Sequence, residues 1–323
     1  MNAPAKFEAR PATRQEEPLL LGMVGPPGGG KTLSSLRIAK GIQSVRGGPI
    51  IVIDTEGGRS RKYADQIPFE IVEFAPPCRP ERFLDAIRDQ LARKPAAIIV
   101  DSASDEHEGE GGYLEWHDEM IPKMGGNEWA AWAKPKASRK RLINGILHIK
   151  TPLIFTFRAR EKTKQDGKKV INIGWQPVAP LEIVHTLDLT CILPPRADGV
   201  PVWRSDKIGE DFIIKLPSYL RPYITEGKAL SEEMGRGLAQ WAKGGATGTA
   251  TAAPAGEATA SPSLDAGGLP GDEDSIFDLA RKKAETLGRK EFLAWYRELS
   301  DDDQAKIDSI HDDLNQRMEA ARS

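Results

Sequence analysis

The sequence is poor in cysteine and has no long apolar run. Its 323 residues include two cysteines, Cys78 and Cys191, and no CxxC pair, so neither a disulfide framework nor a zinc site is expected. The five histidines show no metal-ligand spacing, and no apolar segment approaches the roughly 20 residues that span a bilayer. The first residues also lack the apolar region of a secretory signal. These absences favour a protein of the reducing cytoplasm with no membrane partner.

An excess of charge of either sign is missing too. The chain has 45 Lys and Arg residues against 47 Asp and Glu residues, for a formal net charge of −2. The net charge therefore gives no case for a nucleic-acid partner, and any such partner must be bound by a local basic patch. The hydrophobic share of 39% is that of an ordinary globular protein.

Four segments of the chain differ in composition. Residues 1–17 are polar and predict a flexible N-terminal arm. Residues 18–243 alternate short apolar runs with helical stretches and predict one α/β domain. Residues 244–272 consist almost entirely of Gly, Ala, Thr, Ser and Pro and predict a disordered linker. Residues 273–323 carry apolar stripes at helical spacing and predict a small C-terminal helical module.

The α/β domain is expected to contain a mostly parallel sheet, because several of its apolar runs are hydrophobic on both faces. The predicted strands are residues 19–24, 50–54, 69–74, 96–101, 152–157 and 187–193. The predicted helices are residues 31–43, 80–93 and 127–149, the last broken or kinked near Pro135. Two antiparallel hairpins are also expected: 155–159 with 170–173 around Asp166-Gly167, and 200–204 with 211–216 around Gly209.

Residues 25–32 read GPPGGGKT and fit the phosphate-binding pattern GxxxxGK[ST] completely. The pattern follows a predicted strand and opens a predicted helix, which disfavours the alternative of a glycine-rich turn without a ligand. Backbone N–H groups and the helix N-terminus would surround the phosphates of ATP. Lys31 would reach the β- and γ-phosphates, and the Thr32 hydroxyl would bind Mg²⁺. The predicted nucleotide-binding residues are Gly25, Pro26, Pro27, Gly28, Gly29, Gly30, Lys31 and Thr32.

Acidic residues follow two of the predicted strands. The run AIIVDS at 97–102 is a Walker B pattern, in which Asp101 would hold Mg²⁺ through water and face Thr32 across neighbouring strand ends. The run IVIDTEGG at 51–58 puts Glu56 where a carboxylate can deprotonate a water for attack on the γ-phosphate. In the structural alternative, Asp101 only ends a buried strand and Glu56 is a loop or capping acid.

These three segments, in this order, resemble the core of RecA-like recombinases and ATPases. The closest resemblance is to short phage-encoded ATPases labelled AAA domain or phage nucleotide-binding protein, over about residues 18–220. It implies a RecA-like P-loop NTPase fold, with Glu56 as catalytic base and Ser102 as the serine that follows the Walker B aspartate. It also implies an Mg²⁺-dependent ATPase for DNA recombination, repair or single-strand annealing, acting as a homo-oligomer in the host cytoplasm. Residues 105–126 differ from full-length recombinases, because they are acidic and glycine-rich rather than basic.

A basic segment continues the predicted strand 152–157. Residues 158–169 hold six basic and two acidic residues, and in the RecA-like core the corresponding loop contacts single-stranded DNA and senses the γ-phosphate. Arg158 is the candidate for stabilising charge on that phosphate, with Arg160 as an alternative and Arg204 or Lys207 as alternatives across a subunit boundary. The predicted residues for single-stranded DNA are Arg160, Lys162, Lys164, Lys168 and Lys169, unless this is an ordinary solvated hairpin.

A second basic patch consists of Trp129, Trp132, Lys134, Lys136, Arg139, Lys140 and Arg141. Aromatic residues beside basic ones suit base stacking, but the two tryptophans lie three apart on a predicted helix, which favours packing in the core. His107 and His117 lie among acids and are interpreted as solvated or structural.

Other functions stay open for such a chain. They are a helicase-type motor or loader, a nucleotide-dependent assembly protein with little turnover, and a small-molecule kinase. The C-terminal helices are expected to recruit a protein partner, such as a single-strand-binding protein.

Overall fold

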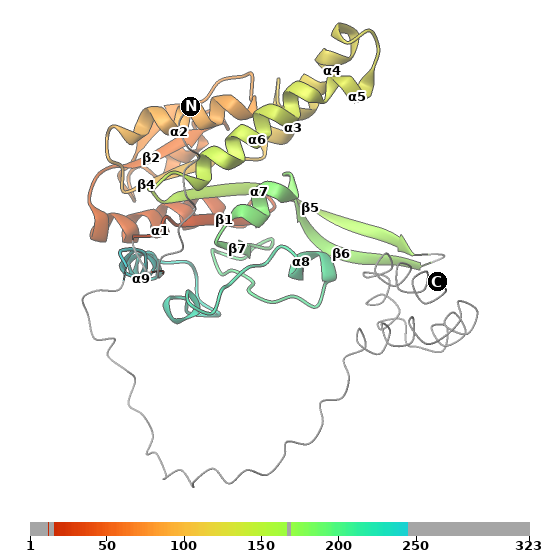
Figure 1. Ribbon diagram of the computed structural model, residues 1–323. Helices are drawn as coiled ribbons and strands as arrows, with labels where there is room; N and C mark the ends of the chain where they lie inside the picture. Colours follow the sequence, from red (N-terminus) through yellow and green to blue (C-terminus); the bar gives the residue numbers. More distant parts are fainter. Residues whose placement is uncertain (1–11, 13–15, 167–168, 245–323) are drawn as a thin grey trace, which may run out of the picture. The chain divides into compact units, whose positions relative to one another are not determined.

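The computed structural model describes residue 12 and residues 16–166 and 169–244 (Figure 1). The predicted C-terminal module, nearly all of the predicted linker and most of the predicted N-terminal arm lie outside these residues. The last two residues of that arm are described and contact the domain. Glu16 pairs with Arg46, and the Glu17 amide donates to the Ala242 carbonyl.

A sheet of seven strands forms the centre of the described domain. Six strands follow the order β3-β2-β4-β5-β1-β7, and each neighbouring pair in this order is parallel. β6 pairs antiparallel with the outer part of β5. The strands are β1 (Leu20–Gly25), β2 (Ile50–Asp54), β3 (Glu70–Glu73), β4 (Ala97–Asp101), β5 (Leu153–Asp166), β6 (Lys169–Pro177) and β7 (Leu189–Ile192).

Helices cover both faces of the sheet. Alternate strand residues point to opposite sides. Leu21 and Met23 of β1 therefore pack into the core beneath α1 and α9, whereas Leu20 and Val24 pack into the core beneath α2, α6 and α7. Burial of both faces explains why β1, and β2 and β4 up to their final Asp, have no charged residue. The helices are α1 (Lys31–Arg46), α2 (Pro80–Leu91), α3 (Asp105–Glu108), α4 (Tyr113–Lys123), α5 (Glu128–Ala131), α6 (Ala133–Leu147), α7 (Leu181–Thr186), α8 (Ile208–Asp211) and α9 (Glu232–Ala242), with 3₁₀ turns η1 (Arg59–Tyr63) and η2 (Arg221–Tyr223).

This strand order and layering confirm the predicted fold class, a RecA-like P-loop NTPase with a mostly parallel sheet flanked by helices. Of the helices in the described part of the chain, none combines the length and the apolar character needed to cross a bilayer.

The predicted helix 127–149 is broken, as expected, and the break lies three residues before Pro135. α5 ends at Ala131 and α6 begins at Ala133, so the break falls at Trp132. Pro135 lies in the first turn of α6, where the missing N–H of proline has no intrahelical partner to lose. The sequence therefore located the irregularity three residues too late.

The two predicted hairpins have different outcomes. In the first, a hairpin joins β5 to β6, but its strands pair differently from the prediction. Residues 170–172 pair with residues 163–165 and Pro177 pairs with Ala159, whereas Phe155 and Phe157 pair in parallel with β1. The second is wrong. Val202 and Lys215 each form an isolated bridge with β7 instead of pairing with each other, and Gly209 lies in the short helix α8. Residues on both sides of α8 thus extend the edge of the sheet at β7.

α1 and α9 pack closely because glycine is present on both helices. A Cβ atom on Gly41 of α1 would overlap the carbonyl oxygen of Glu232, and one on Gly235 of α9 would overlap that of Ile38. Since the obstructing atoms belong to helix backbone, they cannot rotate away as a side chain could. α1 also carries the end of the phosphate-binding motif, so this contact fixes the helix that the motif opens.

We predict that Gly41→Ala lowers the free energy of unfolding by about 2 kcal/mol, as expected for an overpacked core. Alanine favours a helix interior by roughly 1 kcal/mol over glycine, so a helix free of α9 would be stabilised instead. Urea denaturation followed by circular dichroism measures the difference. Arg37→Ala, at an exposed position of the same helix, is the control and should change stability by less than about 0.5 kcal/mol. An unchanged or higher stability in Gly41→Ala would refute the close contact.

Candidate nucleotide site

The motif at residues 25–32 leaves the carboxyl end of β1 and enters α1. Gly28 and Gly30 have φ angles of 80° and 87°, which side-chain-bearing residues rarely adopt. A Cβ on Gly28 would meet no atom within 4 Å, so the loop opens onto free space there. Gly30 directly precedes the first turn of α1. The loop and the helix start therefore form a concave backbone surface of the kind that surrounds phosphate.

Lys31 lies folded over this loop. Its Nζ donates hydrogen bonds to the carbonyl oxygens of Gly25 at 2.8 Å and Pro26 at 3.0 Å. Burial lowers the pKa of Lys31, while the nearby carboxylates of Asp101 and Glu56 act in the opposite direction. The ammonium group is thus held beside the loop by carbonyl acceptors, within the cavity described below.

The side chains of Thr32 and Asp101 are in contact, although β1, which leads to Thr32, and β4, which ends at Asp101, are not neighbouring strands. β5 lies between β1 and β4, which corrects the expectation that the two residues face each other across neighbouring strand ends. The Thr32 hydroxyl donates to Asp101 Oδ2 at 2.7 Å, and Thr156 of β5 donates to Asp101 Oδ1. Asp101 is 5% exposed. The intervening strand thus supplies a second hydroxyl that orients the same carboxylate.

Glu56 projects from a loop that Asp54 holds in place. Asp54 ends β2 and accepts hydrogen bonds from the backbone N–H groups of Glu56 at 2.9 Å, Gly58 at 2.8 Å and Ser60 at 3.2 Å. Sequence reasoning gave Asp54 no role, although an Asp shortly before a Gly-Gly pair is a known turn signal. The buried carboxylate fixes the backbone that presents Glu56.

The environment of Glu56 favours its protonated form. Burial is the largest cause of the raised pKa of Glu56, and the negative charge of Asp101 adds to it. Arg59, whose Nη1 lies 3.7 Å from Glu56 Oε2, opposes this shift, as does Lys31. A carboxyl group with a raised pKa holds a proton more readily than an ordinary glutamate, which suits proton transfer.

Arg158 of β5 lies beside the first residue of the motif. It is paired in register with Gly25, and its Nη2 donates to Asp105 Oδ1 at 2.7 Å. The sequence singled out Arg158 but not Asp105, which belongs to the acidic segment that departs from the recombinase pattern.

These residues share one cavity of about 400 Å³, and it is lined by Pro27, Gly28, Gly30, Lys31, Thr32, Glu56, Arg59, Lys62, Tyr63, Asp101 and Arg158. Of these, Arg59, Lys62 and Tyr63 were not foreseen, because η1 returns to the cavity after the Gly-Gly turn. A hydroxyl and a carboxylate side by side are oxygen ligands of the kind that Mg²⁺ prefers, with water and phosphate oxygens completing its shell. Within the described residues no group of three or more His, Cys, Asp or Glu side chains could hold a metal ion unaided. The donor set therefore fits Mg²⁺ bound together with a nucleotide.

A family model described as an AAA domain matches residues 17–193, which is more than half of the chain. The chain belongs to this AAA domain family. The match extends from the residues before β1 to the end of β7 and contains every residue that lines the cavity. Membership supports a nucleotide-binding, P-loop ATPase-like domain. No curated protein matches the sequence.

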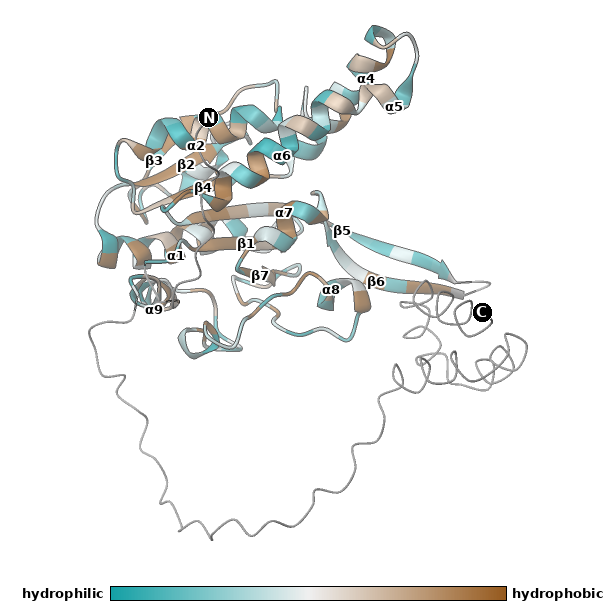
Figure 2. Cartoon of the chain, in the orientation of Figure 1, coloured by the Kyte–Doolittle hydropathy of each residue, from teal (hydrophilic) through white to brown (hydrophobic). Residues whose placement is uncertain are grey.

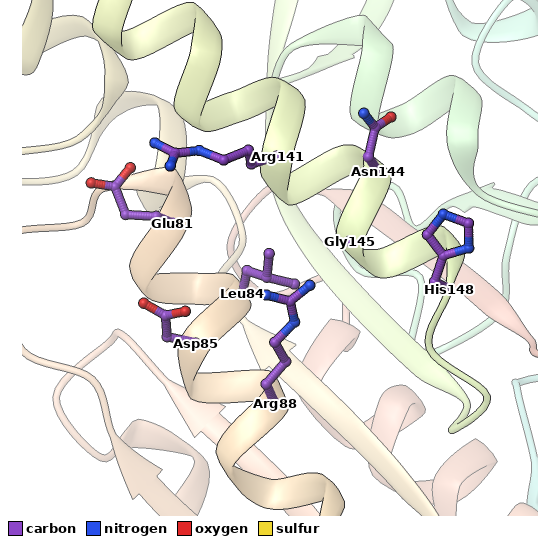
Figure 3. Close-up of a pocket in the computed structure, with 8 residues that line it drawn as sticks. All are labelled: Glu81, Leu84, Asp85, Arg88, Arg141, Asn144, Gly145 and His148. Atoms are coloured by element: carbon purple, nitrogen blue, oxygen red, sulfur yellow. The ribbon is translucent and has the colours of Figure 1, made fainter. Parts of the chain in front are cut away.

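A larger cavity of the AAA domain, about 490 Å³, lies between α2 and α6 (Figure 3). Glu81, Asp85 and Arg88 project from α2, and Arg141 of α6 extends toward Glu81. None of residues 25–32 lines this cavity. It is a charged groove between two packed helices and is separate from the phosphate-binding motif.

The predicted DNA-binding residues that the structure describes lie along the hairpin of β5 and β6, whose β5 strand is hydrophilic in its outer part (Figure 2). Arg160, Lys162 and Lys164 alternate along β5 and are exposed, so they share one face of the strand. Both terminal nitrogens of Arg160 bond the Glu108 carboxylate, at 3.2 and 2.7 Å. Lys168 and the side chain of Lys169 lie outside the described residues.

The second basic patch is divided by the fold. Trp129 is 86% exposed, which corrects the expectation that it packs in the core. Trp132 is partly buried and stacks on His117 with ring centroids 3.7 Å apart. Arg139 is buried in an ion pair with Glu106 and does not face solvent. The exposed basic residues of the patch are Lys134, Lys136, Lys140 and Arg141.

The remaining candidates lie away from the cavity. Arg204 is exposed, and Lys207 pairs with Glu210 at 3.6 Å and Glu161 at 4.0 Å. Neither residue lines the cavity. Ser102 is fully buried, and its amide donates to the Thr55 hydroxyl.

We predict that Lys31→Met weakens ATP binding about a hundredfold or more, because the cavity loses the cation that lies over the phosphate loop. Methionine keeps the length and the apolar stem, so the fold should persist. Titration with a fluorescent ATP analogue measures the affinity. The control is Lys40→Met on the same helix, since Lys40 bonds only Gln43 among the described residues. Equal affinities in all three proteins would exclude this cavity as the phosphate site.

Proposed function

We propose that this AAA domain is an Mg²⁺-dependent ATPase that binds single-stranded DNA in recombination, repair or strand annealing. The observation that carries the proposal is the shared cavity, in which Lys31, Thr32, Asp101, Glu56 and Arg158 converge. Each has the chemistry required for phosphoryl transfer to water: a cation at the phosphate loop, oxygen ligands for a metal ion, a carboxylate base and a second cation.

The proposed reaction transfers the γ-phosphoryl group of ATP to water. Glu56 accepts a proton from the water as its oxygen attacks the γ-phosphorus, and the bond to the bridging oxygen breaks with its electron pair leaving on ADP. Lys31 and Arg158 stabilise the negative charge that builds up on the phosphate oxygens. Thr32 and Asp101 would hold Mg²⁺, which neutralises charge on the β- and γ-phosphates when bound.

DNA binding would be coupled to this site through β5. The strand carries Arg158 in the cavity and then Arg160, Lys162 and Lys164 on its exposed part. Lysine and arginine neutralise the phosphates of a single strand without regard to sequence. Because both sets of residues belong to one continuous strand of 14 residues, a change at the phosphate reaches the hairpin without crossing a flexible loop.

The proposal includes self-association of the chain in the host cytoplasm, with Arg204 or Lys207 completing the site of a neighbouring copy. Its protein partner would bind the predicted C-terminal module, residues 273–323, which lies outside the described residues.

The proposed function predicts that single-stranded DNA stimulates ATP hydrolysis more than duplex DNA does. Phosphate release measured with no DNA, with a single strand and with a duplex checks this. Glu56→Gln should reduce hydrolysis by about a hundredfold or more, as loss of a general base does, while ATP affinity stays near that of the wild type. Lys31→Met should lose both ATP hydrolysis and tight ATP binding. A hydrolysis rate that DNA does not change would favour a small-molecule kinase. Tight ATP binding without hydrolysis would favour a nucleotide-dependent assembly protein.

The DNA arm of the same experiment uses two double variants. Lys162→Ala with Lys164→Ala should lower the slope of log affinity against log salt by about 0.7 for each DNA phosphate that the protein no longer neutralises. Lys150→Ala with Lys228→Ala removes the same charge from exposed positions outside the hairpin and should leave the slope unchanged. Equal slopes in both double variants would remove the hairpin from the DNA-binding surface.

The electrostatics of Glu56 predict the pH dependence of hydrolysis. A general base acts when deprotonated, so kcat/KM should fall as pH falls through the pKa of Glu56, which burial raises from its ordinary value. Arg59 lowers this pKa. Arg59→Ala should therefore raise it and move the acid limb to higher pH. Arg61→Ala is the matched control, because Arg61 pairs with Glu73 instead. Superimposable profiles for both variants would contradict this role of Glu56.

A further inference from the structure

The short helix α3 places three carboxylates against three arginines from other parts of the fold. Asp105 pairs with Arg158, Glu106 with Arg139, and Glu108 with Arg160. The helix follows the Walker B strand by three residues. The first residues of the acidic segment that distinguishes this chain from full-length recombinases therefore contact both Arg158, which lines the proposed ATP site, and Arg160 of the basic hairpin.

Asp105 joins two parts of the nucleotide site. Its Oδ1 accepts from Arg158 Nη2 at 2.7 Å, and its Oδ2 accepts from the hydroxyl of Thr55 at 2.5 Å. Thr55 directly precedes Glu56 in the loop after β2. Through one buried carboxylate, the arginine that lines the cavity is thus connected to the loop that carries the proposed base.

The helix that carries Asp105 is itself fixed. Glu106 accepts from Arg139 Nε at 2.9 Å and Nη2 at 3.0 Å, and both side chains are buried. Separating a buried pair of this kind leaves an uncompensated charge, which is strongly unfavourable. In addition, Ser104, just before α3, accepts from the Arg158 amide at 2.9 Å. Asp105 therefore occupies a rigid position relative to β5.

We propose that Asp105 is a positioning residue, which orients the Arg158 guanidinium toward the γ-phosphate and keeps it aligned with the loop of Glu56. The proposal rests on the proposed ATPase function and adds a residue to it. Arginine loses much rotamer freedom when it is held in one orientation, so a fixed carboxylate that pre-orders it removes that cost from the reaction. Among the described residues, Asp105 is the one carboxylate in an ion pair with Arg158.

An asparagine at position 105 fits the same geometry without the charge. Its carbonyl oxygen can accept from Arg158, and its amide can donate to the Thr55 hydroxyl, which then donates to the Ser102 carbonyl oxygen 3.1 Å away. Asp105→Asn therefore weakens the hold on Arg158 and keeps the neighbouring hydrogen bonds. This allows positioning to be separated from folding.

The test measures kcat and KM for ATP in the full chain with Asp105→Asn, Arg158→Ala and the double variant. Asp105→Asn should lower kcat by about tenfold or more, as misplacement of a reacting group does, with KM changed by less than about threefold. The double variant should be no slower than Arg158→Ala alone, because the two residues act as one unit. Asp188→Asn, which alters a carboxylate at the opposite end of β1 that accepts from the Leu20 amide, should keep its activity.

Chemical rescue supplies a readout that a merely structural role would not change. Guanidinium ion at millimolar concentration should restore hydrolysis several-fold in Arg158→Ala and fail to do so in the double variant. Full activity in Asp105→Asn, or equal rescue with and without the carboxylate, would overturn the positioning role alone. A wild-type chain that hydrolyses no ATP would overturn the proposed ATPase function, and the positioning role with it.

Discussion

β5 lies between β1 and β4, and the three strands are parallel. Their arrangement therefore brings the GPPGGGKT loop after β1, the Asp101 carboxylate of β4 and the Arg158 guanidinium of β5 to the same edge of the sheet. Gly25 is in register with Arg158, and Asp54 is in register with Asp101. A shift of one residue in any strand would turn these side chains to the opposite face. The parallel register is therefore the constraint on which the cavity depends, and the two buried faces of the sheet enforce it.

The acidic side chains near this edge of the sheet differ in their hydrogen-bond and ion-pair partners. Asp54 is surrounded by backbone N–H donors, Asp101 by two hydroxyl groups, and Asp105 by a hydroxyl and a guanidinium. Glu56 instead pairs at 3.7 Å with Arg59, whose side chain is exposed. Burial and the charge of Asp101 raise the pKa of Glu56. Four carboxyl groups at one edge of the sheet thus have four different sets of neighbours.

Local signals in the sequence were sufficient to predict the main strands, because strands buried on both faces are mostly apolar. They were also sufficient to predict the strand–loop–helix that carries GPPGGGKT, because the motif follows an apolar run and opens a helical one. Features that depend on tertiary contacts were missed. Nothing near Asp105 in the sequence indicates that Arg158 lies beside it. The hydrophobic pattern of residues 200–216 resembles a hairpin, but its residues pair with β7 instead. Trp129 is exposed whereas Trp132 is partly buried, because the ring of Trp132 packs against those of His117 and Tyr113.

The length of β5 has a mechanical consequence. The strand continues eight residues beyond Arg158 to Asp166, which corresponds to about 26 Å at the usual rise of a strand. Pairing with β6 stiffens this extension into a two-stranded ribbon. The base of this ribbon lies beside the phosphate-binding loop, because Arg158 is in register with Gly25. A tilt of the ribbon by about 10° at its base would therefore move its tip by roughly 5 Å, which is comparable to the spacing between adjacent strands of a sheet.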